Sequence, residues 1–172
     1  MKPQTRTHFT LSLLTAGILC ASTATWAANV PAGTQLADKQ ELVRNNGSDP
    51  ASLDPHKVES DVEFNIISDL FDGLVSVSPA GEIQPRLAEK WENKDNTVWT
   101  FHLRPGITWS DGTPITAEDI VWSWQRLVDP KTASPYASYP GSMRIVNGTD
   151  IAEGKKAPES LGVKAINDTT LE

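Results

Sequence analysis

The sequence predicts an α/β fold, and two observations support this. Two segments, 60–74 and 116–128, carry apolar residues at helical spacing behind a capping residue. Several short segments rich in apolar residues are separated by clusters of Gly, Pro, Asn and Asp, which is typical of strands joined by turns. A chain of roughly 150 residues can bury about two-thirds of its unfolded surface, which suffices for one packed domain.

The first 27 residues are typical of a secretory signal peptide. Lys2 and Arg6 form a basic start, an apolar stretch too short to span a bilayer follows, and small residues precede an expected cleavage after Ala27. We therefore expect an exported, soluble mature chain. Cys20 is the single cysteine, and Leu19 before it disfavours lipidation. The mature chain is thus expected to lack thiols for disulfides, catalysis or metal binding.

The charge balance disfavours nucleic acid as a partner. The chain has 15 Lys and Arg against 22 Asp and Glu, and without Lys2 and Arg6 the count is 13 against 22, a net charge of −9. Phosphate binding requires clustered basic charge, which this composition does not provide. A hydrophobic content of 38% with six tryptophans predicts an ordered chain.

The first elements of the mature chain are a short strand and a helix. Residues 41–44 predict the strand, and the turn-rich run 45–50 follows it. Ser60 and Glu63 have the spacing of a capping box ahead of an apolar helical stripe. Gly73 marks the expected end of that helix.

Strands are predicted in the middle of the chain. Segments 74–77 and 82–87 flank a Ser-Pro-Ala-Gly turn and predict a hairpin. After the polar segment 92–96, residues 98–103 predict a strand whose core face is the one that carries Trp99. Core packing is also expected for the other tryptophans of the mature chain except one, Trp122, which lies off the main helical stripe.

A second helix is predicted behind Thr116, with Asp119 placed to complete its capping box and Pro130 to stop it. Residues 132–154 show no regular period and predict a long loop, which in compact domains is often functional. The last predicted elements are a strand at 161–166, a turn and the opening of a partner strand. A chain that stops there leaves backbone groups unpaired, so we expect a truncated polypeptide.

Two chemical interpretations of the segment around His56 are weaker than a structural one. Asp54, His56 and Glu59 match no established spacing of metal ligands. Ser52, Asp54 and His56 are crowded onto one turn, unlike the separated residues of a catalytic triad, and the chain has no Gly-x-Ser-x-Gly elbow. A turn stabilised by the Asp54 carboxylate explains these residues more simply.

Two runs carry a resemblance to a known family. They are Trp-Thr-Phe-His-Leu-Arg at 99–104 and Trp-Ser-Asp-Gly-Thr-Pro-Ile-Thr-Ala-Glu-Asp at 109–119. With the segments 52–56, 69–74 and 132–139, they resemble the extracellular solute-binding proteins of ABC peptide importers. The resemblance implies the N-terminal part of a two-lobed periplasmic binding protein, a hinged clamp with a mixed sheet and flanking helices. Residues 28–71 would begin the first large lobe, and residues 72–172 would form the second small domain with the start of the return to that lobe.

The resemblance also implies a function. A monomeric periplasmic protein of this family captures oligopeptides by main-chain pairing and delivers them to inner-membrane ABC permease subunits, without catalysis, cofactor or metal. Relatives that bind murein peptides, dipeptides, nickel or haem remain alternatives. An exported peptide hydrolase and a signalling or chaperone-like protein are alternatives from other classes.

Four residues are expected at the ligand by carry-over from the family. Glu59, Ser60 and Asp61 fall where the first lobe lines the peptide cleft, and Tyr136 falls where an aromatic side chain of the second domain contacts the ligand. The competing interpretation of Glu59 is a surface carboxylate favoured by a helix N-terminus. The residues that hold the peptide termini belong to the other lobe, so we expect the 172-residue chain alone to bind peptides weakly or not at all.

Overall fold

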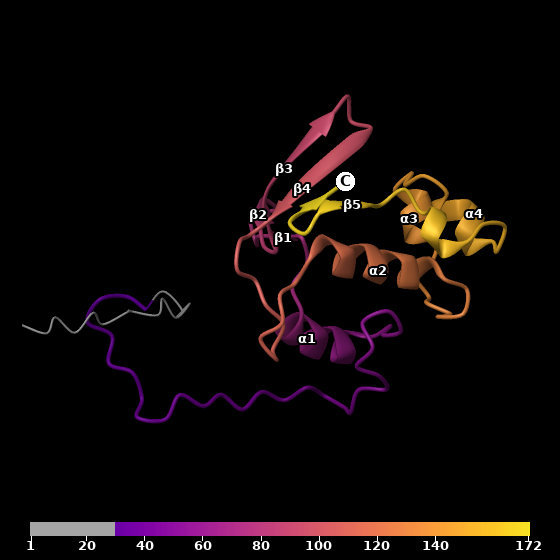
Figure 1. The fold of residues 1–172 in the computed structure, drawn as a ribbon. Coiled ribbons are helices and arrows are strands. Elements are labelled where there is room, and N and C mark those ends of the chain that lie inside the picture. The colour runs from indigo at the N-terminus through magenta and orange to yellow at the C-terminus, as the bar shows by residue number, and fades with distance from the viewer. Residues whose placement is uncertain (1–29) are drawn as a thin grey trace, which may run out of the picture. The chain divides into compact units, whose positions relative to one another are not determined.

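The computed structural model describes residues 30–172. The predicted signal peptide, including Cys20 and its cleavage site, lies outside the described residues. The chain divides into a first unit, Met1–Val43, and a second, Arg44–Glu172. Every helix and strand of the described residues lies in the second unit, which is shown in Figure 1. No helix among residues 30–172 has the length and apolar character needed to cross a bilayer.

The predicted strand at 41–44 is wrong. Residues 41–44 form neither helix nor strand, and the side chains of Leu42 and Val43 are 88% and 97% exposed. A strand is stable only when its backbone groups pair with a neighbour. No strand among the described residues pairs with this segment.

The first helix, α1, spans Asp61–Leu70 and confirms the predicted capping box. The backbone N–H of Ser60 donates to the carboxylate of Glu63 at 3.0 Å, so the helix begins where the sequence indicates. The helix ends earlier than predicted, because Phe71 already has an extended backbone, with φ −126° and ψ 148°.

The predicted hairpin is confirmed as β1, Val75–Val77, paired antiparallel with β2, Ile83–Pro85. The next strand was missed: the predicted polar segment 92–96 is largely part of β3, Ala88–Lys94. Its charged side chains face solvent while its backbone pairs with β4, Val98–Leu103, in an antiparallel ladder. Two residues with positive φ, Asp95 at 53° and Asn96 at 54°, make the turn between the strands.

A four-stranded antiparallel sheet forms the centre of the second unit, with strand order β3-β4-β6-β5. The two short strands at its other edge are β5, Ala165–Asn167, and β6, Thr170–Leu171. The predicted strand at 161–166 is thus confirmed only in its last residues. The turn and partner strand after it are present.

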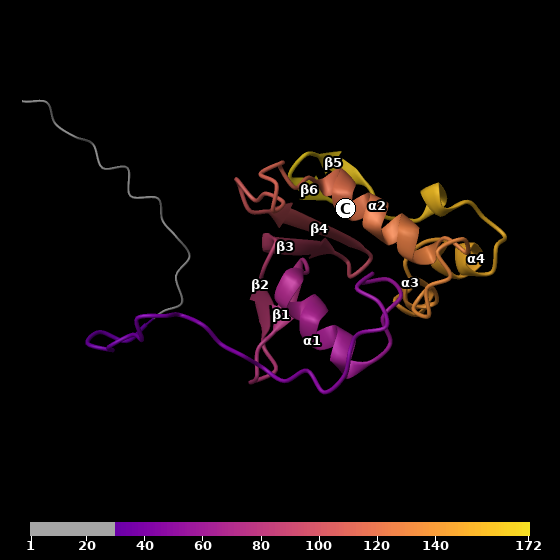
Figure 2. The same cartoon turned by 90° about the horizontal axis from the view of Figure 1, so that it is seen from below.

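The helix α2, Ala117–Val128, carries the core of the unit. The backbone N–H of Thr116 donates to Asp119 at 2.8 Å, which confirms the second capping box. The helix packs on β5 and β6 and extends to the helical region of residues 139–152, as Figure 2 shows. Two buried clusters border it: Leu103, Ala117, Val121 and Leu171 in one, and Val128, Ile151 and Leu161 in the other.

The predicted loop 132–154 contains two short helices, α3, Tyr139–Ser142, and α4, Gly148–Ala152. Helices of four and five residues are too short to leave a helical period in the sequence. They are locked together by backbone packing, since a Cβ atom at Gly148 would come within 2.6 Å of the Gly141 nitrogen. The single-turn 3-10 helix Pro158–Ser160 follows.

The tryptophans only partly follow the prediction. Trp122 is 63% exposed, as expected for a residue off the stripe. Trp91 and Trp124 are half-buried. Core burial is wrong for Trp99 and Trp109, each 42% exposed. Trp99 belongs to the turn end of β4, and the hairpin of β3 and β4 extends beyond α2 there (Figure 1), whereas Leu103 at the other end of β4 is buried.

Candidate functional site

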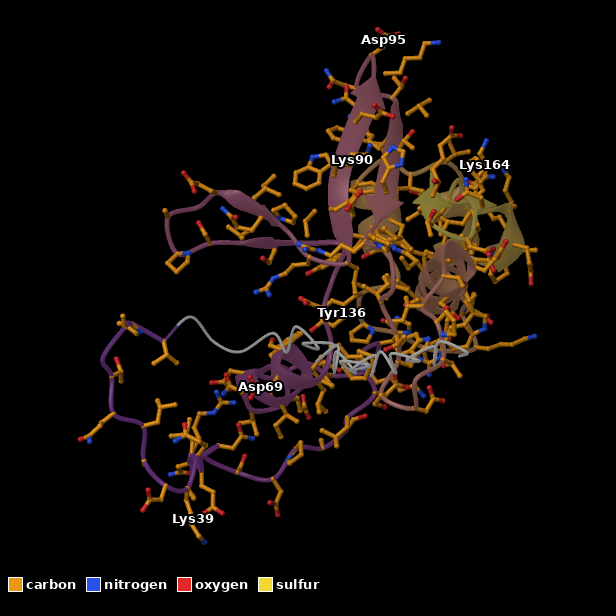
Figure 3. All side chains as sticks on the ribbon, turned by 60° about the vertical axis from the view of Figure 1, so that its left-hand side comes forward. Lys39, Asp69, Lys90, Asp95, Tyr136 and Lys164 are labelled. Atoms are coloured by element: carbon orange, nitrogen blue, oxygen red, sulfur yellow. The ribbon has the colours of Figure 1, made fainter. Side chains whose placement is uncertain are left out.

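The structure brings the predicted ligand residues together at the N-terminus of α1. Glu59, Ser60 and Asp61 form the exposed turn that leads into the helix. Tyr136, labelled in Figure 3, is half-buried beside α1, with its ring centroid 6.3 Å from that of Phe64. Residues far apart in the sequence therefore share one surface.

Tyr136 also forms an aromatic pair with Tyr139, the first residue of α3. The ring centroid of Tyr139 lies 5.2 Å from that of Tyr136, tilted by 52°, which is a favourable arrangement of two rings. Burial raises the pKa of the Tyr136 phenol above its ordinary value, and the negative charges of Glu59 and Glu63 add to the shift after that of Tyr139. The phenol is thus neutral near pH 7 and can both donate and accept hydrogen bonds.

The turn at the start of α1 is built around the buried carboxylate of Glu63. One of its oxygens accepts from the backbone N–H groups of Glu59 and Ser60, both at 3.0 Å, and the other accepts from the N–H of Ala51 at 2.9 Å. These N–H donors, that of Glu59 first, lower the pKa of Glu63 from 4.5 to about 2. The carboxylate therefore stays ionised and closes the loop 51–60 at both ends.

The carboxylates of the turn remain available to a ligand. Within residues 30–172, the Glu59 carboxylate makes no hydrogen bond or ion pair, and Asp61 accepts only the neighbouring N–H of Val62, at 3.0 Å. Two exposed acidic side chains next to an aromatic pair can accept from peptide N–H groups and attract an ammonium group. The sequence-based alternative for Glu59, a surface carboxylate at a helix N-terminus, describes the same placement.

A cluster of polar side chains joins the loop before α1 to α2. We call this cluster the Arg126 clasp, and it consists of Asp54, His56, Ser123 and Arg126. Two parallel bonds, at 2.8 and 2.6 Å, run from the guanidinium of Arg126 to the carboxylate of Asp54. Nδ1 of His56 lies 2.7 Å from Nη1 of Arg126, and Nε2 of His56 lies 3.3 Å from Oγ of Ser123. Neither Ser123 nor Arg126 is predicted from the sequence.

The Arg126 clasp differs from a catalytic triad. Arg126 has only donors, so Nδ1 of His56 must accept and the proton resides on Nε2. In a triad the proton lies on the nitrogen that faces the carboxylate, and the other nitrogen is free to take a proton from the nucleophile. The arrangement therefore cannot activate Ser123 as a general base would.

The structural interpretation of the His56 segment is confirmed. The N–H of His56 donates to the Asp54 carboxylate at 3.1 Å, and the N–H of Lys57 donates to the Asp54 carbonyl at 2.9 Å, which together form the predicted turn. Across residues 30–172, no group of three His, Cys, Asp or Glu side chains has the arrangement of a metal site.

An open, mostly apolar groove of about 640 Å³ lies on another part of the unit. It is bordered by the end of α1, the segment 108–115 and α2, and His56 and Ser123 contribute to its wall. The predicted ligand residues lie outside its lining, so the groove and the α1 turn are separate features.

Comparison with known proteins places the chain among solute-binding proteins. The family described as "Bacterial extracellular solute-binding proteins, family 5 Middle" matches residues 82–172. The periplasmic oligopeptide-binding protein OppA of Salmonella typhimurium is 60% identical over 164 residues, which are 94% of this chain and 30% of that protein. The periplasmic murein peptide-binding protein MppA of Escherichia coli is 52% identical over 146 residues, 85% of this chain and 27% of that protein.

A solved structure agrees with these relatives. Haemophilus influenzae OppA, in complex with the peptide RPPGFSPFR, superimposes with a TM-score of 0.75 at 50% identity. The match covers 80% of this chain and 27% of the OppA chain. The chain thus spans about 30% of the length of the relatives it matches, and the expected α/β framework of a periplasmic binding protein is confirmed.

Proposed function

The chain belongs to the bacterial extracellular solute-binding proteins of family 5, and from this premise we propose that its protein captures oligopeptides in the periplasm for import by an ABC transporter. The observation that carries the proposal is the surface at the start of α1. Exposed carboxylates and the Tyr136 ring lie side by side there, in a chain 60% identical to an oligopeptide-binding protein.

We propose that Glu59, Ser60, Asp61 and Tyr136 contact the ligand. The acidic side chains would meet N–H and ammonium groups, and the Tyr136 ring would cover an apolar part of the peptide. Such contacts read features that all peptides share, while water in the remaining pockets adapts to different side chains. Residues 28–71 would begin the first large lobe of a hinged clamp, and residues 72–172 would form its second small domain with the start of the return to the first lobe.

The same proposal covers location and partners. The signal peptide would be cleaved after about Ala27, and the mature protein would act as a monomer in the periplasm and dock on inner-membrane permease subunits. It would need no cofactor and catalyse no reaction. The tautomer imposed on His56 by Arg126 supports this choice over an exported hydrolase.

A second candidate ligand is a murein peptide, because MppA is 52% identical to this chain. Both ligands are short peptides, so the α1 turn and Tyr136 suit either one. The distinction requires direct competition between them.

Isothermal titration calorimetry on the full-length gene product tests the proposal. Tri- and tetrapeptides should bind with micromolar or tighter affinity, and a murein tripeptide serves as the competitor. The variants Tyr136→Ala and Glu59→Gln should each weaken binding about tenfold, equivalent to about 1.4 kcal/mol. The control Glu89→Gln removes an exposed carboxylate on β3 and should bind like the wild type. No binding of any peptide by the full-length product would refute the proposed function.

The isolated 172-residue chain offers a further test. We expect it to bind tripeptides weakly or not at all, because the groups that hold the peptide termini would lie in the part of the family's length that this chain does not span. Micromolar binding to this chain would contradict that assignment of the contacts.

A further inference from the structure

We infer that Arg126 and His56 are positioning residues for ligand capture: the Arg126 clasp holds the turn that presents Glu59 and Asp61. The inference rests on the proposed peptide capture, and it goes further by assigning a role to residues that do not touch the ligand. It is carried by the geometry that links α2 to the loop before α1.

The clasp ties two positions of the loop, Asp54 and His56, to α2. Arg126 Nη1 carries two hydrogens, one directed to Asp54 and the other to His56, while Nη2 reaches the second oxygen of Asp54. Ser123, one helical turn earlier, holds the far nitrogen of the imidazole. Arg126 keeps the pKa of the Asp54 carboxyl far below its usual range, so this ion pair persists at any physiological pH.

The constraint reaches the ligand residues through a short stretch of chain. Val58, two residues beyond His56, is fully buried, and the N–H of the next residue, Glu59, donates to the Glu63 carboxylate. Glu59 is therefore fixed between the clasp on one side and Glu63 on the other. Loss of the clasp would leave Glu63 as the main polar restraint on this turn.

The clasp also links the acidic turn at the start of α1 to the region of Tyr136. At its C-terminal end, close to Arg126, α2 packs through Val128 against Ile151 of α4, and α4 contacts α3, the helix that follows Tyr136. Arg126 and Val128 are two residues apart on the same helix. A single rigid helix thus sets the position of the acidic turn relative to the aromatic ring, a distance that a bound peptide must match.

The imidazole makes the clasp sensitive to acid. Burial, and next the positive charge of Arg126, lower the pKa of His56 from 6.5, while Asp54 opposes the shift. The charged groups near His56 are Asp54 on its own segment and Arg126 on α2, and Asp72 and Asp119 border the groove that His56 lines. If Nδ1 of His56 were protonated, it could no longer accept from Arg126, and the two positive charges would repel each other. The clasp is therefore complete at neutral pH and opens as the pH falls below the lowered pKa of His56.

The test uses the full-length gene product and two measurements. Hydrogen exchange of the segment 51–63 in ligand-free protein should be about tenfold faster in Arg126→Met than in the wild type at pH 7.5. Affinity for a labelled tripeptide, followed by fluorescence anisotropy, should fall at least fivefold in the same variant. The control Arg144→Met removes an exposed arginine elsewhere and should change neither measurement.

The variant His56→Asn separates positioning from mere folding. An asparagine oxygen can accept from Arg126 but does not titrate. The affinity of His56→Asn should therefore match that of the wild type at pH 7.5, and in a titration from pH 7.5 downward it should stay constant where the wild-type affinity falls. Wild-type pH dependence in His56→Asn would overturn the inference, as would unchanged exchange and affinity in Arg126→Met. Wild-type protein that binds no peptide would instead refute the proposed function, whatever the exchange rates show.

Discussion

Replacement of Ile151 by Ala should destabilise the chain strongly, because Ile151 is 0% exposed at the centre of the cluster under α4. The change removes three carbon atoms, and at about 0.8 kcal/mol for each buried methylene the lost transfer free energy is about 2.4 kcal/mol. The neighbouring Val128 and Leu161 are also buried, so the site collapses only partly and the residual cavity adds to the cost. We expect a total loss of about 3–4 kcal/mol.

Urea denaturation of the 172-residue chain, followed by tryptophan fluorescence, measures this loss. With a slope of about 1.5 kcal/mol per molar urea, the unfolding midpoint should fall by about 2 M. Ile166→Ala provides the matched control, because Ile166 is 52% exposed on β5 and its truncation should cost less than about 1 kcal/mol. Equal losses in the two variants would refute the assignment of Ile151 to the core.

Three further predictions concern local structure, each checked by urea denaturation. Because folding lowers the pKa of Glu63 from 4.5 to about 2, the contribution of this carboxylate to stability is complete above about pH 4.5 and is lost as the pH falls toward 2. In Glu63→Gln the free energy of unfolding should depend less on pH in this range, and an unchanged pH dependence would contradict the prediction. Thr116→Ala removes a helix cap and should cost about 1 kcal/mol, so a wild-type midpoint would count against the cap. Gly148→Ala should lower stability by about 1–3 kcal/mol, because the new Cβ would meet the Gly141 backbone at 2.6 Å, and a gain in stability would disprove the close packing of α3 and α4.

The elements that sequence reasoning located correctly are those whose cause is local. The two capping boxes, at Ser60 and Thr116, rest on residues three positions apart, and both are present in the structure. The hairpin of β1 and β2 likewise follows from a four-residue turn. These features depend on neighbours along the chain, so a single sequence contains the information needed to find them.

The errors arise where distant chain segments decide the structure. The segment 41–44 has strand composition but no partner among the described strands, whereas the polar segment 88–94 becomes a strand because β4 pairs with it. Strand formation depends on pairing and on which face is buried, and composition reports only part of this. The helices α3 and α4 were missed because four and five residues are too few to show an apolar period, and because the close contact between Gly141 and Gly148 leaves no pattern in the sequence.

The candidate site likewise contains residues that were expected and residues that were missed. The placement of Glu59, Asp61 and Tyr136 near one another follows an expectation that came from the family resemblance, and their contact with a ligand stays a prediction. The Arg126 clasp could not be predicted from the sequence because Arg126 and Asp54 are 72 positions apart. Arg126 belongs to the polar side of an amphipathic helix, and in one sequence such a residue looks like any solvated arginine.

The acidic residues of the α1 turn perform different tasks, and their surroundings explain the division. Glu63 is buried and saturated with backbone donors, so its charge serves the fold and is unavailable to a ligand. Glu59 and Asp61 are exposed, and because the Glu63 carboxylate already holds their turn, they need no structural partner of their own. The Glu63 carboxylate thus keeps the turn ordered while the carboxylates of Glu59 and Asp61 remain exposed to solvent. If the proposed ligand contacts hold, this arrangement should favour neutral or positively charged groups of a ligand and oppose a ligand that brings negative charge to the same place.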